Sequence, residues 1–187
     1  MNRRQLLCGL GITSLSLLAL SPQAFAMGGT LPELDQGAPD FNLGGVAPDA
    51  GGATREAQLK LADFAGQWLV LYFYPRDFTE GCTIEARGFQ RDLADFRKAG
   101  AAVVGISADD ADSHSQFCGS ESLAFPLLSD PGGRVSTAYG SWIAPFSQRH
   151  TFLIDPAGIL RARWTAVRPS GHSQEVLAEL LQLKQQA

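Results

Sequence analysis

Residues 75–82 read Pro-Arg-Asp-Phe-Thr-Glu-Gly-Cys, and they join an apolar run to a segment with helical periodicity. The run at 68–74 contains no polar break, which is typical of a central strand covered on both faces. A helix is expected at 82–98, beginning at or near Cys82. Its apolar stripe consists of Ala86, Phe89, Leu93 and Phe96. A thiol in the first helical turn faces unpaired backbone N–H groups and the positive end of the helix dipole, so we expect a lowered pKa and a nucleophilic sulfur.

The composition indicates one globular domain. The chain has 187 residues, of which 45% are hydrophobic and 18% are charged, enough to build a single core and unlike a disordered segment. Its formal net charge is −4 and no basic run follows the first few residues. Nucleic acid is therefore a poor choice of partner. We expect the folded domain to cover residues 27–187.

Residues 1–26 have the pattern of an export signal. Arg3 and Arg4 are followed by an apolar stretch at 6–20 and by Ala-Phe-Ala at 24–26, a small-residue cleavage site. The pair of arginines resembles a twin-arginine signal. An uncleaved anchor or a buried helix is the alternative, but about 15 apolar residues are short for a membrane span. We expect a cleaved signal, loss of Cys8, a periplasmic location and no stable membrane association.

The remaining elements alternate along the chain. Residues 27–56 are rich in Gly, Pro and Ala and are expected to form a tether and loops, with at most a short strand or hairpin around 40–43. The later elements are expected as strand 101–107, helix 111–119, extended segment 125–128, short helix 134–139, a hairpin of 151–154 with 159–164, and helix 172–184. This order predicts an α/β fold with a central mixed sheet and helices on both faces, of which the thioredoxin-like arrangement is one form.

Several motifs together resemble a known family. The pattern Pro75-x-x-x-Thr79-x-x-Cys82 is similar to the active-site pattern of the peroxiredoxins, and Gly-Cys-Thr-Ile-Glu-Ala at 81–86 resembles their PrxQ branch, the bacterioferritin comigratory proteins. Further matches are Ala-Pro-Asp-Phe at 38–41, Phe-Pro-Leu-Leu-Ser-Asp at 125–130, and Arg-x-Thr-Phe-Leu-Ile-Asp at 149–155. The resemblance covers about residues 32–185 and implies a thioredoxin-like fold and a thiol peroxidase.

The resemblance also implies roles for individual residues. Cys82 would attack a hydroperoxide and become a sulfenic acid. Arg149 would stabilise the thiolate and the departing oxygen, Thr79 would contact the peroxide, and Pro75 would shape the loop and shield the sulfur. Taken singly, Thr79 and Pro75 could be ordinary turn residues, and Arg149 could be an ordinary surface charge. Glu85 either hydrogen-bonds the arginine or the backbone, or is simply a first-turn acid. No metal or organic cofactor is required.

The second cysteine of the mature chain leaves three readings open. Many PrxQ proteins carry a resolving cysteine five residues after the first, but Arg87 occupies that position here. Cys118, 36 residues after Cys82, resembles the resolving cysteine of a subgroup that places it in the next helix. A disulfide needs Cα atoms within about 7 Å, so we expect the first turn of each helix to unwind. Cys118 is otherwise half of a static bridge, worth roughly 4 kcal/mol, or an idle buried thiol of a one-cysteine enzyme.

Two other functions compete with the peroxidase. A thioredoxin-type oxidoreductase needs Cys-x-x-Cys, but Glu85 occupies the second cysteine position. A redox-dependent binding or sensor protein is the non-enzymatic alternative. The expected partners of the peroxidase are a hydroperoxide substrate and a thioredoxin-like reductant, and the chain is expected to be a monomer. The three histidines show no metal-ligand spacing with the cysteines, so structural roles are expected for them.

Overall fold

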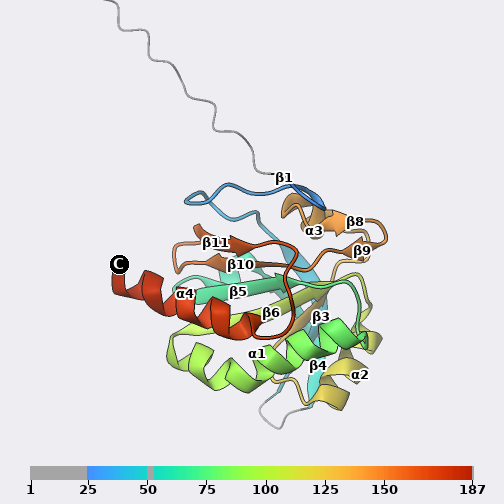
Figure 1. Ribbon diagram of the computed structural model, residues 1–187. Helices are drawn as coiled ribbons and strands as arrows, with labels where there is room; N and C mark the ends of the chain where they lie inside the picture. The colour runs from blue at the N-terminus through green and yellow to red at the C-terminus, as the bar shows by residue number, and fades with distance from the viewer. Residues whose placement is uncertain (1–24, 50–52, 187) are drawn as a thin grey trace, which may run out of the picture.

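A seven-stranded mixed sheet forms the centre of the computed structural model, which describes residues 25–49 and 53–186 (Figure 1). The strand order is β11-β10-β5-β6-β7-β3-β4. These strands are β3 (Asn42–Pro48), β4 (Thr54–Lys60), β5 (Trp68–Phe73), β6 (Ala101–Ser107), β7 (Leu127–Ser129), β10 (His150–Ile154) and β11 (Leu160–Trp164). The strands β5, β6 and β7 are parallel, while β10 runs antiparallel to β5 and β3 runs antiparallel to β7.

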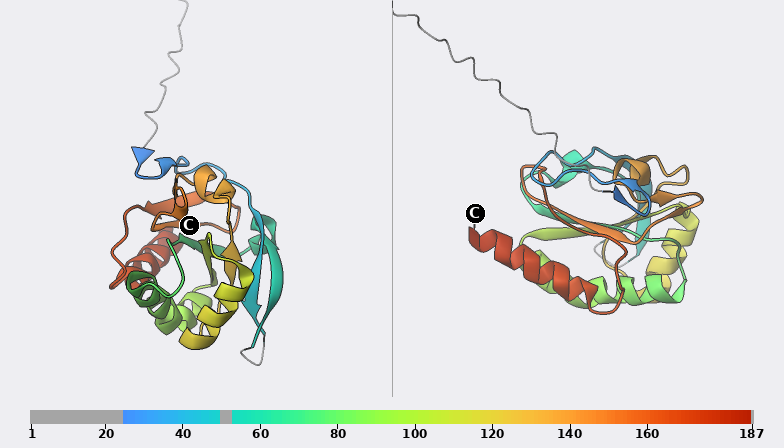
Figure 2. Two further views of the ribbon diagram at one scale, coloured as in Figure 1. Left: turned by 90° about the vertical axis from the view of Figure 1, so that its right-hand side faces the viewer. Right: turned by 45° about the horizontal axis from the view of Figure 1, so that its top comes forward.

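Helices cover both faces of this sheet, as predicted. The helices α1 (Glu80–Lys98) and α4 (His172–Gln186) lie together on one face, and α2 (Ala111–Glu121) packs on the same side near β3 and β4 (Figures 1 and 2). The short helix α3 (Arg134–Ala138) lies on the opposite face beside the hairpin β8 (Trp142–Ile143) and β9 (Phe146–Ser147). A 3₁₀ turn, η1 (Leu61–Phe64), precedes β5.

The central strand β5 divides the core into two clusters because its side chains alternate between the faces. Trp68, Val70, Tyr72 and Tyr74 pack with the helices α1, α2 and α4. Leu69, Leu71 and Phe73 pack on the other face with residues of α3 and the N-terminal segment. Both Cys82 and Cys118 belong to the first cluster. The two thiols are therefore buried on the same side of the sheet, on two different helices.

The region 27–56 differs from the prediction. Instead of loops with at most a short hairpin, it contains the seven-residue strand β3, which pairs along its length with β4. Glycines such as Gly44 and Gly45 contributed to the expectation of loops, but Gly45 is needed where β3 pairs with β7: a Cβ there would lie 2.2 Å from the carbonyl oxygen of Leu127. The strand β4 is largely exposed at the sheet edge, so it lacks the apolar alternation that predicts a strand.

Most of the expected export segment lies outside the described residues. Only Phe25 and Ala26 are included, and this short strand β1 pairs with β2 (Gly29–Thr30). Among residues 25–49 and 53–186, no helix has the length and apolar character needed to cross a membrane.

Candidate active site

Cys82 lies in the first turn of α1. The helix begins at Glu80, two residues earlier than expected, with Thr79 as the N-cap residue in extended conformation. The thiol is buried among apolar side chains, and the predicted stripe of the helix packs beside it as expected. Backbone N–H groups in a first turn have no intrahelical acceptor, and this end of the helix dipole is positive. The sequence prediction of a cysteine at a helix start is confirmed.

Arg149 approaches Cys82 from the far end of the chain. It immediately precedes β10, whose first residue, His150, pairs with Phe73 at the end of β5. This register brings the guanidinium over the first turn of α1, where Nη2 donates a hydrogen bond to Sγ of Cys82 at 3.2 Å. A Cβ on Gly81 would lie 3.1 Å from that same nitrogen, so a glycine at this position leaves space for the guanidinium. This contact places the permanent positive charge of Arg149 next to the sulfur.

Glu85 holds the other side of the same guanidinium. Its Oε2 accepts a hydrogen bond from Nη1 of Arg149, and the carboxyl group is almost fully buried. Burial raises the pKa of Glu85 to about 7, although the charge and hydrogen bonds of Arg149 oppose this shift. Its Oε1 finds no hydrogen-bond partner within the described part of the chain. Of the two sequence readings, the contact with the arginine is the one observed.

Thr79 and Pro75 shape the loop before the helix. The hydroxyl of Thr79 is exposed and donates to the carbonyl oxygen of Arg76 at 3.1 Å, so its lone pairs are left to accept a hydrogen bond from a bound molecule. Pro75 is half-buried directly after β5 and has no N–H of its own. The loop also contains Phe78, which has a positive φ of 59° and an exposed ring. The structure therefore brings Pro75, Thr79, Cys82, Glu85 and Arg149 into one region.

Cys118 is buried on α2, and the structure records both described cysteines as free thiols. Burial, and secondarily the charge of Asp77, raises the pKa of Cys118 to about 12. The residue lies in the last turn of α2, which ends at Glu121, and not in its first turn. The unwinding of helical turns that disulfide formation is expected to need stays a prediction.

The buried hydroxyl of Tyr72 belongs to the same cluster as both thiols. Tyr72 projects from β5 into the cluster that contains Cys82 and Cys118, and its hydroxyl has no hydrogen-bond partner among the described residues. Burial raises its pKa well above the ordinary value, and the charges of Glu85, Cys118 and Cys82 act in the same direction. Both sulfurs are therefore close enough to influence one phenol electrostatically.

Sequence reasoning missed a polar cluster beside the loop. Asp77 is buried and accepts hydrogen bonds from Tyr74, Ser113 and His114. The contact between Asp77 and His114 joins residues 37 positions apart, which no local sequence pattern could indicate. The structural reading of the histidines is confirmed: His114 contacts Asp77, His150 contacts Ser141, and Nε2 of His172 lies 2.8 Å from Oγ1 of Thr151.

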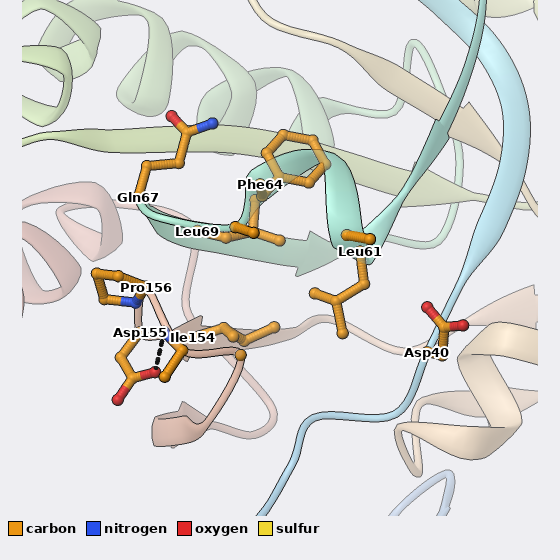
Figure 3. A pocket seen from close by; sticks show the side chains of 12 residues that line it. Asp40, Leu61, Phe64, Gln67, Leu69, Ile154, Asp155 and Pro156 are labelled. Carbon is orange, nitrogen blue, oxygen red and sulfur yellow. Dashed lines mark hydrogen bonds between the residues drawn. The ribbon is translucent and has the colours of Figure 1, made fainter.

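A separate pocket of about 390 Å³ lies at the opposite end of β5 (Figure 3). It is formed by η1, the start of β5 and the turn after β10, with Leu61, Phe64, Ile154 and Pro156 among its lining residues. Neither described thiol lines it. Because it contains no nucleophile, this pocket is not where the sulfur chemistry of Cys82 takes place.

Comparison with known proteins decides the family. Residues 34–163 match the AhpC/TSA family. Peroxiredoxin Bcp of Xanthomonas campestris is 41% identical over 132 residues, which is 66% of this chain and 82% of the relative. Peroxiredoxin Bcp of Bacillus subtilis is 34% identical over 156 residues, which is 79% of this chain and 94% of the relative. The chain belongs to the peroxiredoxin family. As a peroxiredoxin, it is a thiol-dependent peroxidase, and its substrates are hydroperoxides.

Solved peroxiredoxin structures have the same fold. Peroxiredoxin Q of Xanthomonas campestris superposes with a TM-score of 0.68 at 36% identity, covering 75% of this chain and 89% of that one. A cysteine-to-serine mutant of PrxQ from Xylella fastidiosa gives a TM-score of 0.71 at 31% identity and covers 87% of this chain and 99% of that one. The predicted thioredoxin-like fold and the PrxQ resemblance are both confirmed.

Proposed function

We propose that Cys82 is the peroxidatic cysteine of this peroxidase. The hydrogen bond from Arg149 to its sulfur is the observation that carries the assignment, because it provides a positive charge at the one described thiol in a helical first turn. The thiolate attacks the terminal oxygen of a hydroperoxide, the O–O bond breaks, and the hydroxyl group stays on the sulfur while the departing alkoxide or hydroxide takes a proton from water. The products are Cys82 sulfenic acid and an alcohol or water.

The neighbouring groups act by positioning the peroxide and stabilising charge. Arg149 faces the sulfur and can stabilise the negative charge that develops on the departing oxygen. The Thr79 oxygen accepts a hydrogen bond from the hydroperoxide, since its own O–H donates a hydrogen bond to the carbonyl of Arg76. Glu85 fixes the orientation of the guanidinium, and Pro75 shields the thiolate from water.

Cys118 resolves the sulfenic acid in this proposal. Its thiol loses a proton and the sulfur attacks the sulfur of Cys82, the S–O bond breaks, and the departing hydroxide takes up a proton and leaves as water, which gives an intramolecular disulfide. The packing supports the pairing, because both residues belong to one buried cluster. In addition, serine variants of the Xanthomonas campestris protein have been solved for two cysteines 36 positions apart, the same separation as here. Two electrons from a thioredoxin-like dithiol then restore both thiols.

Rapid mixing of the reduced protein with one equivalent of hydrogen peroxide tests these assignments. We expect oxidation much faster than that of free cysteine, followed by a Cys82–Cys118 bond in peptide mass spectra. The variant Cys118→Ser should keep the fast first step and accumulate sulfenic acid, whereas Cys82→Ser should lose it. A wild-type protein that is oxidised no faster than free cysteine would refute the assignment of Cys82. A bond that persists after thorough reduction would indicate a static bridge.

We also propose that the chain is exported and acts as a periplasmic monomer. The arginine pair, apolar stretch and Ala-Phe-Ala sequence of residues 1–26 support export, and the family match begins only at residue 34. The reductant would then be a thioredoxin-like protein of that compartment. Expression of the full chain in a bacterium, followed by fractionation and N-terminal mass spectrometry, should yield a periplasmic protein that begins near Met27. Recovery of the uncleaved chain in the cytoplasm would contradict this proposal.

A further inference from the structure

Asp77 connects the active-site loop to the helix that carries Cys118. Its Oδ1 accepts from the hydroxyl of Tyr74 at 2.8 Å. Its Oδ2 accepts from the hydroxyl of Ser113 at 2.8 Å and lies 2.9 Å from Nδ1 of His114. Because a carboxylate only accepts, this geometry places a proton on Nδ1. Both α2 partners lie about one helical turn before Cys118.

The cluster is buried, so its hydrogen bonds are not weakened by water. Asp77 is 4% exposed and His114 is completely buried. Hydrogen bonds to a carboxylate in such surroundings are among the stronger ones in proteins. The backbone N–H of Asp77 also donates to Asp109, just ahead of α2. The loop is therefore joined to α2 by several polar contacts centred on one side chain.

A second contact joins the same two segments. The ring of Phe78 meets the ring of Phe117, the residue before Cys118, edge to face at 5.2 Å between centroids. The φ of 59° at Phe78 is unfavourable for a residue with a large side chain, so the loop holds a strained conformation while α2 is in place. Opening α2 removes the partner ring and releases this constraint.

The network is incomplete in one respect. Nε2 of His114 is buried and has no hydrogen-bond partner among the described residues. Burying an unpaired polar nitrogen costs free energy, which lowers the net stability that His114 gives to the closed helix. Contacts of this kind hold a segment in place while leaving it able to open.

We propose that Asp77 is a positioning residue for the resolving step: its carboxylate holds α2 closed against the Pro75–Thr79 loop, and release of these bonds limits how fast Cys118 reaches Cys82. This inference rests on the proposed role of Cys118. The closed helix keeps the sulfenic acid in place and Cys118 away from it. A stronger connection therefore slows disulfide formation and leaves more time for a second peroxide to form a sulfinic acid.

The variant Asp77→Asn tests this proposal, because the amide retains the shape but loses the charge. After the fully reduced protein is mixed with peroxide, quenched samples are analysed by mass spectrometry for sulfenic acid, disulfide and sulfinic acid. We expect disulfide formation to become faster by about 10-fold, a lower sulfinic acid yield at high peroxide, and an unchanged rate of the first step. Amide hydrogen exchange of α2, but not of α1, should be faster before peroxide is added.

Two further variants make the result interpretable. Ser113→Ala removes one neutral donor to the carboxylate and should accelerate disulfide formation by roughly threefold, which provides a test if Asp77→Asn does not fold. Asp130→Asn is the matched control, since Asp130 is also a buried carboxylate with three donors but serves Val135 and Ser136 near α3. It should leave disulfide formation unchanged.

The outcomes separate the two proposals. An unchanged or slower disulfide step in both Asp77→Asn and Ser113→Ala would overturn the role of Asp77, and so would an equal acceleration by Asp130→Asn. If the wild-type protein forms no Cys82–Cys118 disulfide at all, the proposed role of Cys118 fails instead.

Discussion

Arg149 donates a hydrogen bond to Cys82 at 3.2 Å although the two residues are 67 positions apart in the chain. The contact depends on the pairing of β10 with β5, which places the residue before β10 next to the loop after β5. The sheet register thus sets the electrostatic environment of the sulfur.

Replacing the guanidinium should slow the first chemical step. Arg149→Gln removes the positive charge and the directional donors, so we expect the second-order rate with hydrogen peroxide to fall by roughly 10²-fold. Stopped-flow measurement of the reduced protein provides the rate. Arg168→Gln is the matched control, because Arg168 is an exposed charge in the loop between β11 and α4. This variant should retain the wild-type rate. Equal rates for Arg149→Gln and the wild type would exclude a catalytic role for this arginine.

Glu85 should make stability depend on pH. Its pKa is raised from 4.5 to about 7 by burial, so between these values the folded protein holds a proton that the unfolded chain has lost. Stability therefore falls as pH rises through this window, by at most about 3 kcal/mol, and is constant above it. Urea unfolding in a Cys82→Ser background should show this slope, and the additional change Glu85→Gln should remove it.

The control for this measurement is Glu80→Gln in the same background. Glu80 is an exposed carboxylate in the first turn of the same helix, so its removal should leave the slope as it is. A slope that survives Glu85→Gln would mean that another group titrates on unfolding.

Cys118 should be a poor nucleophile in the closed reduced enzyme. Burial raises its pKa to about 12, compared with the ordinary value of 9. At pH 8 in a Cys82→Ser variant, iodoacetamide should therefore alkylate the native protein on the order of 10³-fold more slowly than the urea-unfolded protein. Alkylation at the same rate in both states would show that α2 is already open before oxidation.

The glycines of β3 provide a paired test of the fold. An alanine at Gly45 would place its Cβ 2.2 Å from a backbone oxygen of β7, which cannot move independently of the sheet, so Gly45→Ala should cost about 3 kcal/mol or prevent folding. At Gly44 the nearest atom is the end of the flexible Gln58 side chain, 3.3 Å away, so Gly44→Ala should change stability by less than about 1 kcal/mol. Chemical denaturation measures both. Equal effects would mean that β3 does not lie against β7.

The sequence was sufficient where function and local pattern coincide. The run at 68–74 and the stripe of α1 predicted a strand followed by a helix, and hence a cysteine in a helical first turn, without reference to distant parts of the chain. The position of Arg149 followed only from family resemblance, because its partner is defined by the pairing of β10 with β5. The hairpin β3–β4 and the Asp77–His114 contact were not predictable, since the first has glycines that serve packing and the second is a tertiary contact.

The alternation of side chains along β5 divides the core into two clusters, one on each face of the sheet, and only one of them contains the thiols. Both described thiols lie on the side beneath α1 and α2, while the side beneath α3 contains core residues, the buried Asp130 and buried serine contacts. If α1 or α2 opens locally during the redox cycle, the core between the sheet and α3 need not change. We therefore expect the sheet to keep its structure, so that the helices can return to the same positions after each turnover.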